Sequence, residues 1–329
     1  MTVSSRSMPR AGALIFAALT FAACSVPFSA PLDLSPQAYE AIAWSVGMEF
    51  ESGAMQLTAQ DALGTMDCCS RFSQFRPGFL RSGASKLQPA PGQPPLFLVV
   101  DTECGVASQN PPADSDADEV PDNLTITFAL PACRFVHTGT PYDGTFDLTG
   151  VVRLSDPQLG AASMAFDMAL DDYRMTSSQP LYGTGYVRRD GLASVLASGA
   201  GLSQTMSWRD LLKRVGVPDR AWDFDLSATF APAEGATITP GDPLPDGTYA
   251  PSGSFEYRDG NRAARFTVTT VEPLQYSAEC AAQTVANGYG TPFMSGHLRV
   301  FVTNGANRGY VEVSYFYCSG PGATYVPEA

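Results

Sequence analysis

The densest group of side chains suited to chemistry is a short acidic segment in the first half of the chain. It runs Asp114-Ser115-Asp116-Ala117-Asp118-Glu119-Val120-Pro121-Asp122. Carboxylates at alternate positions of a loop can turn their oxygens toward one hard cation, and calcium prefers about six to eight oxygen ligands. We expect a structural calcium ion here, held by Asp114, Asp116, Asp118, Asp122 and the carbonyl of Val120.

This segment resembles the D-x-D-x-D-G-x-x-D calcium loops of EF-hand-like proteins and thrombospondin type 3 repeats. It departs from that pattern at Glu119, where the sharp turn has glycine, and at Thr125, where a full EF-hand loop has a bidentate glutamate. The resemblance implies weak calcium binding. A solvated acidic turn is the alternative.

Signatures of the common enzyme classes are absent from the sequence. It contains no H-E-x-x-H, G-x-S-x-G, S-x-x-K or P-loop motif, and no G-x-G-x-x-G in a strand-to-helix setting. The two histidines, His137 and His297, fall in strand-like sequence without a serine or cysteine partner that stands out. We therefore assign no catalytic residue. A carboxylate-based hydrolase, which needs only two acids close in space, stays open as an alternative.

The N-terminal segment predicts export. Residues 1–10 carry Arg6 and Arg10 without an acid, and an unbroken apolar run follows over 11–23. That run has the length of a signal-peptide core and is too short to span a bilayer as a helix. Residues 1–23 are therefore expected to lie outside the mature fold.

The end of this segment resembles the lipobox of bacterial lipoproteins. Ala22 and Ala23 directly precede Cys24, although Phe21 stands where the motif has an aliphatic residue. The resemblance implies that Cys24 is lipidated and becomes the mature N-terminus, and Ser25 after it implies sorting to the outer membrane of a Gram-negative bacterium. An ordinary secretory signal cut at a nearby small residue is the alternative.

Cysteine usage agrees with an exported protein. Setting one of the seven cysteines aside as the anchor leaves six, which can pair completely in an oxidising compartment. Cys280 and Cys318 are the favoured C-terminal pair, because both fall in the same region. The remaining four are Cys68, Cys69, Cys104 and Cys133. We expect one of the adjacent cysteines, Cys68 or Cys69, to pair with Cys104 and the other to pair with Cys133.

Composition narrows the class of protein further. The chain has 20 Lys and Arg against 33 Asp and Glu, a net charge of −13, and 44% hydrophobic residues over 329 positions. Such an acidic chain does not bind nucleic acid by neutralising phosphates, and its length can bury a sizeable core. We expect a globular, mainly β protein.

Two helices are expected before the sheet. Ser35-Pro36 has the pattern of a helix start, and Tyr39, Ile42, Ala43 and Val46 follow at helical spacing. A second short helix is expected over 59–66. Loops rich in Pro, Gly, Ser and Asp are expected over 87–94 and 105–121, on either side of an apolar strand over 96–100.

From residue 123 onward the pattern predicts antiparallel strands with one solvated face. Apolar and polar residues alternate over 145–152, 166–171 and 222–230. Hairpins are expected around Asp259-Gly260 and Asn304-Gly305. One inserted helix is expected over 207–216, because Ser207 and Asp210 look like a capping pair before an apolar stripe and Gly216 ends it.

Together these features resemble a group of uncharacterised predicted lipoproteins of Gram-negative bacteria. The resemblance rests on the lipobox-like start, the acidic loop leading into 123–128, the run 273–276, Ser295-Gly296 and the two C-terminal cysteines. It implies a location and an architecture but no activity.

We expect a signal peptide over 1–23, a tether over 24–34, a helix and loop region over 35–121, and an antiparallel β-sandwich or barrel-like sheet over 122–329. The expected function is that of a lipid-anchored envelope protein, a binding or structural β-module whose partner is a protein, a glycan or an apolar ligand. A periplasmic carrier of an apolar ligand is the alternative, and it would surround a void with Trp222, Phe224, Phe301 and Tyr315.

Overall fold

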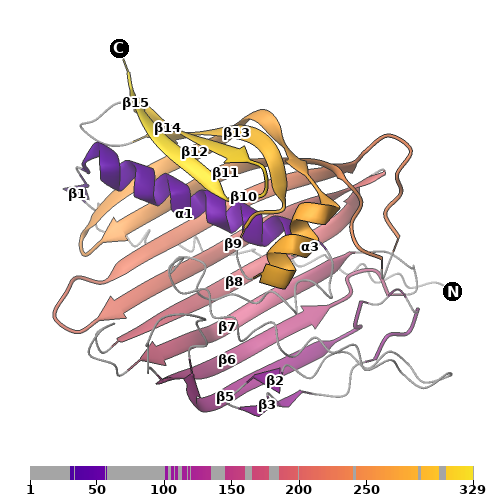
Figure 1. Cartoon of the computed structure of the whole chain (residues 1–329). Helices are drawn as coiled ribbons and strands as arrows, with labels where there is room; N and C mark the ends of the chain where they lie inside the picture. Colours follow the sequence, from indigo (N-terminus) through magenta and orange to yellow (C-terminus); the bar gives the residue numbers. More distant parts are fainter. Residues whose placement is uncertain are drawn as a thin grey trace, which may run out of the picture.

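The computed structural model describes most of the chain from residue 30 onward (Figure 1). The described residues are 30–32, 34–55, 57, 101–102, 105–106, 108–109, 113–116, 118, 120–134, 145–159, 165–177, 185–198, 200–239, 242–287, 290–303 and 309–328. The predicted signal peptide, the helix over 59–66 and the strand over 96–100 lie outside them. None of the described helices is long and apolar enough to cross a membrane.

One large antiparallel sheet dominates the molecule. Its strands β4 to β15 pair in strict sequence order, and β1 adds to β12 in parallel. A separate two-stranded sheet joins β2 and β3. The strands are β1 (Ala30–Pro31), β2 (Asp101–Thr102), β3 (Gly105–Val106), β4 (Ser108–Gln109), β5 (Leu124–Arg134), β6 (Thr145–Ser155), β7 (Phe166–Ser177), β8 (Gly185–Ser198), β9 (Gly201–Arg214), β10 (Arg220–Pro232), β11 (Gly247–Asp259), β12 (Arg262–Tyr276), β13 (Phe293–Val302), β14 (Gly309–Phe316) and β15 (Pro321–Pro327).

The mainly β, antiparallel class expected from the sequence is confirmed, and the sheet is open rather than closed into a barrel. The order of strands ends at β4 on one side and β15 on the other. β3 and β4 are short strands within 105–121, so the expectation of a loop throughout that segment is wrong. β4 pairs with β5 and extends the sheet by one strand.

The expected alternation is confirmed. Along β10, Phe224, Leu226, Ala228 and Phe230 are buried while Asp225 and Thr229 are exposed. β11 and β12 form the first predicted hairpin, with Asp259 paired to Arg262 across Gly260 and Asn261. β13 and β14 form the second; its expected turn residues Asn304-Gly305 lie outside the described residues.

Helix α1 (Pro36–Ala54) is the predicted N-terminal helix. Ser35 caps it by accepting a hydrogen bond from the backbone N–H of Ala38, and proline occupies its first position. The helix lies across the buried face of the sheet, close to β14 and β15 (Figure 1). Trp44 donates a hydrogen bond to the Pro321 carbonyl at 3.1 Å, and Tyr39 stacks on Tyr325 at 5.9 Å.

The helix expected over 207–216 is wrong. Most of those residues belong to β9, whose Leu202, Met206 and Trp208 are buried on the inner face. Gln204 and Asp210 occupy inward positions of the same strand, and these two polar residues conceal its period of two. The apolar stripe that suggested a helix consists of residues from both faces of a strand and from the turn that follows.

The inserted helix lies elsewhere, as α3 (Ala278–Asn287) between β12 and β13. Ser277 starts it, since its carbonyl accepts a hydrogen bond from the N–H of Ala281 at 2.9 Å. The segment is rich in alanine, the strongest helix former, and this signal was available in the sequence. Cys280 lies on this helix and is bonded to Cys318, so the predicted C-terminal disulfide is confirmed, with a Cα–Cα distance of 5.3 Å.

Candidate functional site

The acidic loop expected to bind calcium is closed at its base by hydrogen bonds. The N–H of Asp122 donates to the Ala113 carbonyl at 2.8 Å. The Asp122 carboxylate accepts from the N–H and the hydroxyl of Ser115, at 3.0 and 3.1 Å. Asp122 therefore braces the loop directly before β5.

Three of the predicted ligands converge inside this loop. One carboxylate oxygen each of Asp114, Asp116 and Asp118 lies within 4.8 Å of the other two. Asp118 is 2% exposed and accepts a hydrogen bond from the N–H of Val120 at 2.8 Å. Both carboxylate oxygens of Asp116 are enclosed and have no hydrogen-bond partner among the described residues. Three carboxylates held this close repel one another, and a hard cation would relieve that repulsion.

A second polar group lies between α1 and the sheet, and sequence analysis did not single it out. Arg189 on β8 contacts both carboxylate oxygens of Asp210 on β9 at 2.7 Å. It also contacts Glu49 on α1 at 2.8 Å. These three side chains are 1–5% exposed, so they form a buried ion triad that fixes the helix over two adjacent strands.

Further hydrogen bonds extend this buried group along the helix. Gln204 on β9 donates to the Gly53 carbonyl at 2.9 Å and accepts from the Tyr249 hydroxyl at 2.8 Å. The Tyr315 hydroxyl donates to the Gly47 carbonyl at 2.9 Å. A Cβ atom at Gly53 would lie about 3 Å from Met206 and Gln204, which explains why glycine stands where α1 comes close to β9. We call these residues the helix-docking cluster: Glu49, Arg189, Asp210, Gln204, Tyr249 and Tyr315.

Burial shapes the protonation of the helix-docking cluster. Burial alone would lower the pKa of Arg189, but Asp210 and Glu49 hold it above its ordinary value, so the guanidinium stays charged. Burial raises the pKa of Tyr249 above its ordinary value. Burial also raises the pKa of Tyr315, with a smaller contribution from the negative charge of Glu51. Arg189 is therefore charged and the two tyrosines are neutral near neutral pH, and the burial of the cluster suits it to holding the helix.

The signal that could have revealed this cluster is the register of the strands. All three polar residues stand at inward positions: Gln204 lies between buried Leu202 and Met206, Arg189 comes two residues after buried Val187, and Asp210 comes two residues after buried Trp208. A charged residue at such a position needs a partner, because a buried unpaired charge is strongly unfavourable. In the sequence alone, the spacing of Ser207 and Asp210 predicts a helix cap instead.

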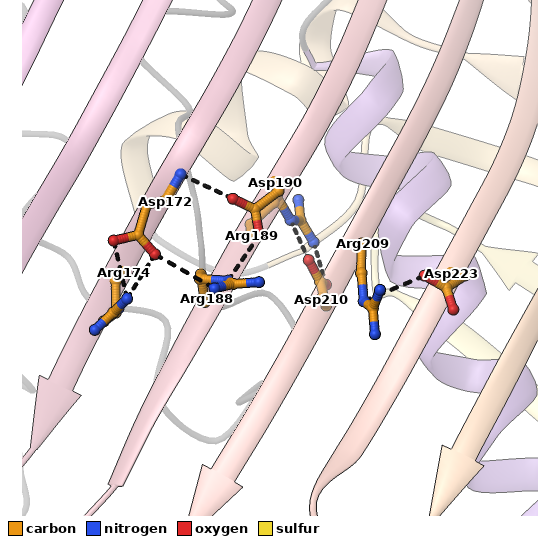
Figure 2. A network of polar contacts seen from close by, with 8 residues as sticks. All are labelled: Asp172, Arg174, Arg188, Arg189, Asp190, Arg209, Asp210 and Asp223. Atoms are coloured by element: carbon orange, nitrogen blue, oxygen red, sulfur yellow. Dashed lines mark hydrogen bonds and ion pairs between the residues drawn. The ribbon is translucent and has the colours of Figure 1, made fainter.

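The outer face of the sheet carries a different set of charges (Figure 2). Arg188 contacts Asp190 at 2.7 Å and Asp172 at 3.7 Å, and Arg174 also contacts Asp172 at 2.7 Å. The series continues across β10 and β11, where Arg258 contacts both Asp223 and Glu256, and it reaches β12 through Arg265, which contacts Glu256 at 2.6 Å. Ion pairs cross the strands here in a half-exposed row, which we call the outer ladder.

Several predicted residues lie outside the described part of the chain. They include the lipidation candidate Cys24, and Cys68, Cys69, Cys104 and His137; of Cys133, on β5, only the backbone is described. His297 is described on β13, where its Nε2 lies 3.7 Å from a Glu312 oxygen.

Comparisons with protein-family models, curated proteins and solved structures give no match.

Proposed function

We propose that this chain is an exported protein, held at the outer membrane of a Gram-negative bacterium by a lipid on Cys24, whose sheet acts as a binding or structural module. The disulfide between Cys280 and Cys318 carries this proposal. Disulfides persist in oxidising compartments and are rare in the cytosol. The lipobox-like sequence before Cys24 supplies the means of attachment.

The test is the mass of the mature protein extracted from native membranes, before and after reduction. We expect a chain that begins at Cys24, carries a diacylglyceryl or triacyl group, and gains two hydrogens for each disulfide reduced. The Cys24→Ser variant should be found unlipidated and outside the membrane fraction. A mature chain without lipid in the wild type, or one recovered with the inner membrane, would contradict the proposal.

Packing of the aromatic residues supports a binding or structural module over a carrier. Trp222 lies 5.1 Å from Tyr257 between ring centroids, and Phe224 lies 5.6 Å from Phe255. Tyr315 contacts Phe293, and Phe301 contacts Tyr310 on the outer face, at 5.0 and 5.6 Å. Rings packed against rings fill space that a carrier would leave for its ligand. Saturable displacement of an apolar dye by extracted lipids would instead favour the carrier.

We further propose that the loop formed by Asp114, Asp116 and Asp118 binds calcium. The enclosed and unpartnered carboxylate of Asp116 favours this second role. Bound calcium would offset most of the negative charge of the three acids and stiffen the loop that leads into β5, which is a structural contribution.

Calcium titration followed by thermal unfolding tests this role. At a concentration about 100 times the dissociation constant, bound calcium should stabilise the protein by about 2.7 kcal/mol. The Asp116→Asn variant should abolish that gain. Asp171→Asn is the matched control, because Asp171 is an exposed acid on the outer face of β7. Equal calcium responses in the two variants would contradict the site.

A further inference from the structure

The two ends of the sheet differ in charge and in exposed apolar residues, and this difference bears on how the molecule meets a membrane. One end contains the turn from β9 to β10 and the hairpin between β11 and β12. These two turns are joined, since the N–H of Gly260 donates to the Asp219 carbonyl at 2.8 Å, and Arg220 pairs with Asp259.

This end exposes valine beside basic residues. Val215 is 79% exposed and Val217 is 53% exposed, although both are fully apolar. The strand ends beside these two turns carry Lys213, Arg214, Arg220 and Arg262, in a chain that has 33 acids against 20 basic residues overall. Two of the four pair with the acids of this end, Lys213 with Asp219 at 3.8 Å and Arg220 with Asp259 at 3.9 Å. We call this set the basic tip: Lys213, Arg214, Val215, Val217, Arg220 and Arg262.

The opposite end is acidic. The connection from β10 to β11 contains Glu234, Asp242 and Asp246 and no lysine or arginine. The acidic loop of Asp114 to Asp122 lies at that end as well, because it leads into the start of β5, where Leu124 pairs with Leu154 at the end of β6. The molecule is therefore electrically polar along its strands.

The predicted anchor leaves the sheet at the basic tip. Ala30 on β1 pairs with Arg262, the first residue of β12 after the hairpin, and β1 runs parallel to β12 from there into the sheet (Figure 1). Only residues 25–29 separate Ala30 from Cys24. A stretch of that length spans at most about 20 Å. A lipid on Cys24 would therefore keep this end of the sheet within reach of the bilayer surface.

We propose that the basic tip contacts the anionic phospholipid surface in which the anchor sits, with Val215 and Val217 inserted at the level of the headgroups. This inference rests on the lipid anchor proposed above. Exposed apolar residues next to lysine and arginine are the combination that binds an anionic membrane interface. The contact would orient the sheet upright, with its acidic end pointing away from the membrane.

The experiment places a tryptophan at the tip of the full-length, lipidated chain. Val217→Trp is compared with Leu159→Trp, since Leu159 is an apolar residue that is 63% exposed at the opposite end, against 53% for Val217. Both proteins are reconstituted into vesicles of phosphatidylethanolamine and phosphatidylglycerol, with and without bromine on the acyl chains. The emission of the unchanged chain, which has its own tryptophans, is subtracted.

We expect brominated lipid to remove about half or more of the added emission of Val217→Trp and almost none of that of Leu159→Trp. Omitting phosphatidylglycerol should weaken the quenching of Val217→Trp severalfold. Equal quenching at both sites, or none at Val217→Trp in a chain that floats with the vesicles, would overturn the inference while leaving the anchor intact. A full-length chain that has no lipid on Cys24 and does not float would overturn both proposals.

Discussion

Two neighbouring arginines on β8 show how differently the two faces of the sheet use charge. Arg189 points inward and Arg188 points outward, and each contacts an aspartate at 2.7 Å. The Arg189 side chain is 5% exposed, whereas that of Arg188 is 31% exposed. Because water screens the outer pair and not the inner triad, equal distances correspond to unequal energies. The comparison indicates that the inner triad specifies where α1 docks, while the outer ladder keeps the exposed face soluble.

Removing the inner arginine should have the largest effect. Arg189→Leu would leave Glu49 and Asp210 buried without their cation, and we expect the free energy of unfolding to fall by about 3–5 kcal/mol. Arg188→Leu is the matched control, because it makes the same chemical change one residue away, and it should cost at most about 1 kcal/mol. Urea unfolding measures both. Similar losses for the two variants would refute the distinction between the faces.

The second-largest loss of stability is expected at alkaline pH, through the buried tyrosines of the inner face. Burial raises the pKa of Tyr249 and Tyr315 above the ordinary value of 10.0. Below pH 10 both tyrosines therefore make their full contribution to the stability of the folded state. As the pH rises above 10, the contribution of each to the free energy of unfolding should fall by about 1.4 kcal/mol per pH unit. Tyrosinate absorbance should show these two groups ionising only together with unfolding. Their ionisation near pH 10 in a folded protein would show that they are accessible.

A single buried hydrogen bond should have an intermediate effect. Tyr249→Phe removes the hydroxyl that donates to Gln204, and we expect a loss of about 1–2 kcal/mol in the free energy of unfolding. On the outer face, Ser252→Ala removes the exposed contact between the Ser227 and Ser252 hydroxyls at 3.0 Å. Ser252→Ala should change the free energy of unfolding by no more than about 0.5 kcal/mol. Chemical unfolding of the two variants side by side would detect a reversal of this order.

The smallest effect is expected from the outer ladder under acid conditions. Partial burial alone would raise the pKa of Glu256, but hydrogen bonds from Arg265 and Arg258 lower it below its ordinary value of 4.5. Its contribution is therefore present above pH 4.5 and is lost as the pH falls through the lowered value. Glu256→Gln should remove a small part of the acid dependence of the melting temperature. A large loss of stability in Glu256→Gln at neutral pH would mean that the contacts of Glu256 with Arg258 and Arg265 stabilise the fold as much as the inner triad does.

The sequence predicted those parts of the fold that depend on local periodicity. The capped start of α1 and the alternation along β10 are local patterns, and both are confirmed. β9 was missed because Gln204 and Asp210 face inward, and their partners Tyr249 and Arg189 are brought beside them only by the assembled sheet. Of the candidate cation ligands, the aspartates at alternate positions converge, while Asp122 braces the loop instead. Periodicity identifies buried positions, but it does not show which polar residue at a buried position has a distant partner.

The packing of α1 also sets the order in which the molecule can be completed. The helix is made near the start of the chain, yet it rests on β15, where Glu40 accepts a hydrogen bond from the N–H of Tyr325 at 2.9 Å. Strands from β5 onward can pair with their predecessors as they emerge, because β4 to β15 follow one another in the sheet in sequence order, and β1 is added beside β12. The helix can complete its packing only after the final strand has been made. A chain cut short before β15 would therefore leave the apolar face of α1 uncovered, in a form that proteases can recognise.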